Sequence, residues 1–146
     1  MTRGVMLWAA MVLAAGAAGA QVKPPNPQMR CLINLKQIGT ALMMFAQEHD
    51  GKLPKAADYK ALNQQLERYI RNPSRSTCPV TGKPYLFNTS LAGAALKSIK
   101  KPVEVPVVRD AAPHPDGSIA FVYADGHSNR LPAAPAKSAI AAGVWK

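Results

Sequence analysis

The strongest constraint on the fold is an apolar stripe in the first third of the chain. Its members recur at alternating steps of four and three residues, which is the spacing of one face of an α-helix. They are Cys31, Leu35, Ile38, Leu42, Phe45 and His49. Asn26 and Pro27 suit the start of a helix, and Asp50-Gly51 suits its end. We therefore predict one long amphipathic helix that turns this stripe toward a core.

The remainder predicts a second, shorter helix and a small sheet, so the fold class is α+β. Apolar side chains recur at helical spacing over about residues 57–70. The strand candidates are residues 85–87, 102–108, 118–123 and 127–131. Prolines in 102–108 predict an edge position for that strand. In 118–123, Ile119, Phe121 and Tyr123 should point to one face and the intervening residues to the other. Asp125-Gly126 predicts a two-residue hairpin turn at positive φ.

The first 20 residues have the composition of a secretory signal peptide. Arg3 is their only charge, residues 5–18 are uncharged and mostly apolar, and Ala18-Gly19-Ala20 precedes Gln21. A membrane-spanning helix needs roughly 20 apolar residues, so an uncleaved anchor is the weaker alternative. The expected location is periplasmic or extracellular, with membrane attachment only through an uncleaved signal.

The domain organisation follows from changes in amino-acid composition along the chain. The segments are a signal peptide at 1–20, a linker at 21–28, a globular domain at 29–132 and an Ala/Pro/Lys-rich tail at 133–146. The sequence leaves open whether the tail is flexible or forms a short docking helix.

The chain is strongly basic. Its 146 residues carry 18 Lys and Arg against 8 Asp and Glu, a formal charge of +10, which becomes +9 when Arg3 leaves with the signal peptide. Lys97, Lys100 and Lys101 cluster ahead of the strand at 102–108. Such a patch attracts polyanions such as DNA or acidic polysaccharide. The alternative is a basic surface without a dedicated partner.

Two cysteines, Cys31 and Cys78, remain after the signal peptide. In an oxidising compartment an even pair predicts a disulfide. Chain-entropy arithmetic gives such a bridge at most about 4 kcal/mol of stabilisation. Two separate buried thiols are the alternative, because the sequence does not place the two residues in contact.

Several motifs occur in an order that resembles a known bacterial family. In chain order they are residues 31–39, 46–54, 69–73, 78–79 and 85–88, and then His114 and Asp125-Gly126. Together they resemble the pseudopilin-related family named for a His-x(9)-Asp-Gly motif, which is similar to the major pseudopilins of type II secretion. The resemblance covers about residues 29–131. It implies a long amino-terminal helix packed on a small antiparallel sheet, and a non-enzymatic role through protein–protein contacts in an envelope assembly.

Two features depart from that family. Ten residues rather than nine separate His114 from Asp125. The chain also lacks a prepilin leader, since its first acidic residue is Glu48. An ordinary export signal stands where a pilin carries its polymerising helix. We therefore expect a secreted pseudopilin-like domain in or near a type II secretion or pilus-type assembly, with an extracytoplasmic polyanion-binding module as the alternative.

Residues that could bind a metal are few and scattered. His114, Asp125 and His127 offer zinc ligands but lack short helical spacing. Major pseudopilins carry a calcium loop, and Asp110, Asp116 and Asp125 are the weak candidates for one here. We expect no other cofactor. Since no phosphate-binding glycine loop, paired carboxylates or nucleophile elbow occurs, we expect neither an enzyme nor a small-molecule substrate.

Overall fold

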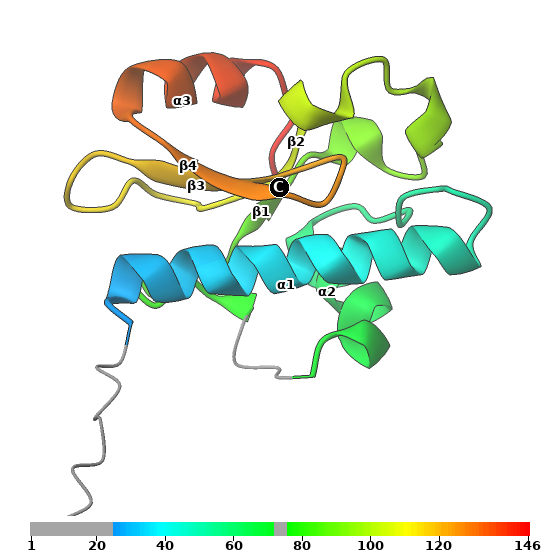
Figure 1. Ribbon diagram of the computed structural model, residues 1–146, viewed down its shortest axis with the longest axis horizontal. Coiled ribbons are helices and arrows are strands. Elements are labelled where there is room, and N and C mark those ends of the chain that lie inside the picture. The colour runs from blue at the N-terminus through cyan, green and yellow to red at the C-terminus, as the bar shows by residue number, and fades with distance from the viewer. Residues whose placement is uncertain (1–24, 72–75) are drawn as a thin grey trace, which may run out of the picture.

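The computed structural model describes residues 25–71 and 76–146 (Figure 1). The predicted signal peptide and residues 21–24 of the predicted linker lie outside the described residues. Within those two ranges, no helix combines the length and the apolar character needed to cross a membrane.

The predicted long helix is confirmed as α1, Pro27–Glu48. The side-chain oxygen of Asn26 caps it by accepting a hydrogen bond of 2.8 Å from the Met29 amide. The predicted stripe is buried from Cys31 to Phe45, but His49 at the end of the helix is exposed. The second helix is also present, as α2, Tyr59–Leu66, followed by a 3-10 turn at Glu67–Tyr69.

Four antiparallel strands form one sheet in the order β1-β2-β3-β4. They are β1 Leu86–Phe87, β2 Pro106–Arg109, β3 Ile119–Tyr123 and β4 Ser128–Leu131. Helix α1 lies across one face of this sheet, and a third helix, α3, Ala133–Ala141, lies on the other (Figure 1). The α+β class is thus confirmed, with the sheet between two helical layers.

The edge position predicted for residues 102–108 is wrong. Strand β2 starts at Pro106 and lies between β1 and β3, while residues Pro102–Glu104 form a 3-10 turn. The proline is tolerated because β1 is only two residues long and faces Val108 and Arg109, so no residue of β1 lies opposite Pro106. The Pro106 carbonyl instead accepts a bond of 3.0 Å from the Asn88 side chain.

The alternation predicted for β3 is confirmed, and both of its faces are buried. Ala120 and Val122 face the main core beneath α1. Ile119, Phe121 and Tyr123 form a second core with Ala136 of α3. The segment whose form the sequence left open is therefore helical and covers the outer face of the sheet.

The hairpin between β3 and β4 has a three-residue loop, Ala124–Gly126, rather than the predicted two-residue turn. The Tyr123 amide donates to the His127 carbonyl at 2.9 Å and closes this loop. Of the loop residues only Gly126 has a positive φ, 87°. The loop also lies against α1, because Gly39 approaches Gly126 so closely that a Cβ at Gly39 would be 3.0 Å from the Gly126 carbonyl carbon. Glycine at position 39 thus permits the helix to touch the hairpin backbone.

Candidate metal centre

Four side chains from separate parts of the chain converge in the interior. They are Cys31, Cys78, Asp110 and His114, and their sulfur, oxygen and nitrogen ligand atoms all lie within 4.8 Å of one another. Cys31, Cys78 and Asp110 are 0% exposed and His114 is 3% exposed. In the part of the chain that the structure describes, this is the only such group of three or more metal-ligating side chains.

Each of these residues is positioned by a different element. Cys31 belongs to the buried stripe of α1, and Asp110 directly follows β2. Cys78 begins a tight loop in which its amide donates to the Lys83 carbonyl at 2.9 Å. His114 lies before β3 in a turn, where its amide donates to the Ser118 carbonyl at 2.8 Å. The cluster therefore joins the helix, the sheet and two loops.

The contacts inside the cluster are short and polar. The Cys31 thiol donates to Oδ1 of Asp110 at 2.9 Å, and Nε2 of His114 lies 3.0 Å from the other carboxylate oxygen. Nε2 is also 3.4 Å from the sulfur of Cys78. The amide of Ala120 in β3 donates to Oδ2 of Asp110 at 2.8 Å, and this bond fixes the carboxylate. All four groups thus meet around one small volume.

Burial and hydrogen bonding set the protonation of these groups. A hydrogen bond from Cys31 lowers the pKa of Cys78 to about 4, aided by the backbone amides of Thr81 and Val80. The same thiol pairing, together with burial, raises the pKa of Cys31. Burial raises the pKa of Asp110 to about 6. These shifts favour the thiolate form at Cys78 and the protonated thiol at Cys31.

The arrangement does not match a nucleophilic triad. In a triad the acid binds the histidine nitrogen opposite the nucleophile, whereas Asp110 and Cys78 both approach Nε2 of His114. The other nitrogen, Nδ1, is buried and has no hydrogen-bond partner among the described residues. A substrate also cannot reach side chains that are so completely buried. Groups buried in this way can hold protons or bind a metal ion, and the two cysteines could also form a disulfide.

The two cysteines predicted as a disulfide are brought together in this cluster, but both are free thiols in the structure. The disulfide therefore stays a prediction. The alternative, two buried thiols without a bond between them, is what the structure has, although their sulfurs lie within 4.8 Å of each other.

The other two predicted ligand sets do not form. Asp125 lies on the hairpin loop and bonds His127 at 2.6 Å, away from the buried His114. Of the calcium candidates, Asp110 is buried in the cluster, whereas exposed Asp116 accepts hydrogen bonds from Ser118 in a turn. Neither set occurs as a metal-ligating group within residues 25–71 and 76–146.

Sequence reasoning missed the role of Asp110 beside the cysteines. The only local signal is its spacing, four residues before His114 and directly after a strand. A spacing of four residues brings two side chains together when both residues belong to one helix. Asp110 and His114 lie in a loop, so their spacing alone does not predict the contact.

The basic cluster Lys97, Lys100 and Lys101 lies on the surface, outside the buried group. Lys97 and Lys100 are exposed and have no ion-pair partner among the described residues, whereas Lys101 pairs with Glu104 at 3.2 Å.

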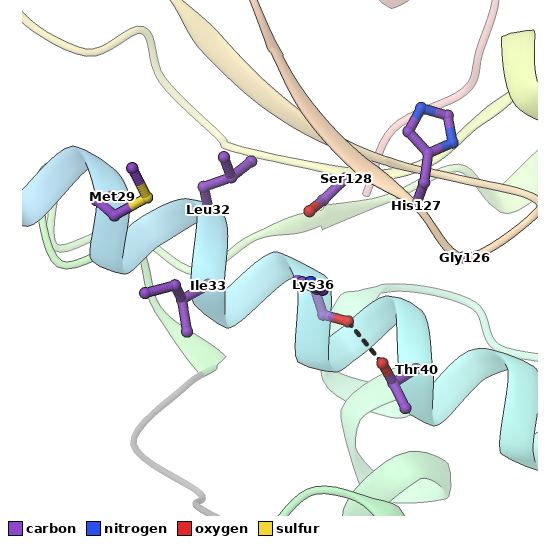
Figure 2. A pocket seen from close by; sticks show the side chains of 8 residues that line it. All are labelled: Met29, Leu32, Ile33, Lys36, Thr40, Gly126, His127 and Ser128. Carbon is purple, nitrogen blue, oxygen red and sulfur yellow. Dashed lines mark hydrogen bonds between the residues drawn. The ribbon is translucent and has the colours of Figure 1, made fainter. Parts of the chain in front are cut away.

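A surface pocket of about 440 Å³ lies where the first turns of α1 meet the β3–β4 hairpin (Figure 2). Its lining consists of Met29, Leu32, Ile33, Lys36, Thr40, Gly126, His127 and Ser128. Figure 2 shows the helix side chains on one wall and the hairpin on the other. The pocket is thus a groove between α1 and the β3–β4 hairpin.

Comparison of the chain with family models, with curated proteins and with solved structures finds no match in any of the three.

Proposed function

We propose that this is a secreted, non-enzymatic, pseudopilin-like protein that acts by protein–protein contacts in or near a type II secretion or pilus-type assembly of a bacterial envelope. The order of the sequence motifs supports the proposal, as does a long amino-terminal helix on an antiparallel sheet. The most reactive side chains are sealed inside the protein, which favours a binding role over catalysis. Its location would be periplasmic or extracellular.

The observation that carries the proposal is the solvent face of α1. Met29, Ile33 and Met44 are 50%, 39% and 43% exposed, and they lie along the side of the helix that is not packed on the sheet. From Met29 to Met44 this face extends about 22 Å at 1.5 Å per residue. Exposed Lys36 and Thr40 lie between Ile33 and Met44, so this face carries both apolar and polar side chains, as protein-binding surfaces do. The groove in Figure 2 adjoins its amino-terminal end.

Site-specific photo-cross-linking in the native envelope tests this function. A photoreactive amino acid at Ile33, which lines the groove, should cross-link to a pilin-type or pseudopilin-type subunit identified by mass spectrometry. The matched control is the same amino acid at Val103, which is 54% exposed but lies on the turn before β2. The control should give no such product. Equal products from both positions, or only unrelated proteins from Ile33, would contradict the proposal.

A second candidate is an extracytoplasmic polyanion-binding module, favoured by the exposed lysines Lys97 and Lys100, for which residues 25–71 and 76–146 supply no ion-pair partner. Converting both to glutamate should weaken DNA retention on a filter at low salt by about tenfold or more. Binding of a lysine to a phosphate releases counterions from the DNA, and each lost contact removes that favourable contribution. The wild-type protein should itself lose binding steeply as salt rises. Lys137→Glu, an exposed change on α3, is the control. If low salt retains no DNA, this candidate is excluded.

A further inference from the structure

We propose that Cys31, Cys78, Asp110 and His114 form a structural Zn²⁺ site that ties α1 to the sheet. This site goes beyond the proposed function, since it does not depend on which partner the protein binds. It replaces the scattered histidine and aspartate ligands that the sequence suggested.

The chemistry of the donors selects the metal. Two thiolates, one imidazole and one carboxylate make four ligands, the number found in closed structural zinc sites. Calcium and magnesium prefer oxygen ligands, and calcium needs six to eight of them, so soft sulfur donors disfavour both ions. Complete burial leaves no open position for a substrate, as expected of a structural rather than a catalytic site.

The spacing of the donors is close to what tetrahedral zinc requires. A sulfur at 2.3 Å and a nitrogen at 2.0–2.1 Å from the ion lie about 3.5 Å apart at the tetrahedral angle. The observed distance from Cys78 Sγ to His114 Nε2 is 3.4 Å. The Asp110 oxygens are 2.9 Å from Cys31 Sγ and 3.0 Å from His114 Nε2. Both distances are shorter than those between two ligands of a tetrahedral zinc ion, so zinc binding would move the carboxylate outward by roughly half an ångström.

The crowding of acidic groups also favours a cation. The Cys31 thiol contacts the Asp110 carboxylate at 2.9 Å, and the sulfur of Cys78 lies within 4.8 Å of both. Buried acidic groups are strongly unfavourable in their ionised form unless a positive charge compensates them. A divalent cation would satisfy all four groups at once and displace the thiol proton.

Surrounding groups already orient three of the four ligands, Asp110, Cys31 and Cys78. The Ala120 amide holds Asp110 at 2.8 Å, and the hydroxyl of Tyr85 lies 3.6 Å from the sulfur of Cys31. Amides of Val80 and Thr81 favour the thiolate form of Cys78. Such outer partners fix the ligands of zinc sites. Because the ligands come from α1, two loops and the end of β2, the ion would act as a cross-link between them.

The test uses the full chain purified under reducing, non-oxidising conditions. Elemental analysis should find one Zn²⁺ per chain after dialysis against Zn²⁺. Substitution with Co²⁺ should give the visible bands of a tetrahedral ion and a thiolate charge-transfer band. Removal of the metal with a chelator should lower the melting temperature by on the order of 10 °C, and added Zn²⁺ should restore it.

Variants identify the ligands. Asp110→Asn retains an acceptor for the Ala120 amide but should weaken Zn²⁺ binding at least tenfold. Cys78→Ser should weaken the thiolate band of the Co²⁺ form, because Cys31 would remain as the second thiolate ligand. His127→Asn changes a histidine outside the cluster, and this variant should bind Zn²⁺ like the wild type.

If the ligand variants fail to fold, alkylation of the wild-type thiols tests the site. Bound Zn²⁺ should protect both thiols from the alkylating reagent, and removal of the metal with the chelator should allow both to react. Folded, reduced protein without bound metal would overturn the site. The site would also be overturned if the zinc-free protein had an intact mass two hydrogens lower than the reduced chain, because that mass indicates a disulfide.

Discussion

Replacing Phe121 by alanine should destabilise the protein by about 3–5 kcal/mol, the range for removing a fully buried aromatic ring. Phe121 is 0% exposed and fills the second core, between β3 and α3. For a domain of this size the melting temperature should fall by on the order of 10–20 °C. Thermal and denaturant unfolding of the variant measure the loss.

The control for this prediction is Val103→Ala, at a site 54% exposed, which should change stability by no more than about 0.5 kcal/mol. A loss below about 1 kcal/mol in Phe121→Ala would mean that α3 does not cover this face of the sheet. The prediction thus tests whether the carboxyl-terminal segment belongs to the folded domain.

Gly39→Ala should destabilise the protein even though alanine is the better helix former. The propensity gain is about 1 kcal/mol. Against it, the new Cβ would overlap the carbonyl oxygen of Gly126 and press on the side chain of Val122 at 3.2 Å. The Gly126 backbone and the buried Val122 side chain can move little to make room for the new Cβ. We therefore expect a strain of about 3 kcal/mol and a net loss of stability near 2 kcal/mol. Chemical denaturation measures it from the transition midpoint.

Gln47→Ala is the matched change, because it places the same residue on the exposed side of the same helix. It should leave stability within about 0.5 kcal/mol of the wild type. If Gly39→Ala proves more stable than the wild type, the close approach of α1 to the hairpin is not present in solution.

The parts of the fold that could be predicted from sequence depend on local pattern. Helix α1 follows from a stripe with a period of 3–4 residues and from Asn26 at its cap, and the hairpin follows from the alternation in β3 and from Gly126. Here the residues that determine an element lie within it.

The candidate metal centre could not be predicted in this way. Cys31 and Asp110 are in contact although 79 residues separate them, and Cys78 and His114 are 36 residues apart. Their meeting depends on how α1 and two loops pack against the end of β2. Similarly, the central place of β2 depends on β1, a strand of two residues that is too short to show a pattern.

Backbone pairing of Lys146 with Phe87 covers the free edge of β1, one of the two edge strands of the sheet. Two backbone hydrogen bonds of 2.8 and 3.0 Å join these residues, so Lys146 occupies the outer edge of β1. On the opposite edge, β4 presents exposed Asn129 and Arg130 and is followed by Pro132, features that discourage the addition of a foreign strand. Growth by edge-to-edge β-pairing is therefore disfavoured on both sides. Any ordered assembly built from this protein should instead join copies or partners through helical surfaces.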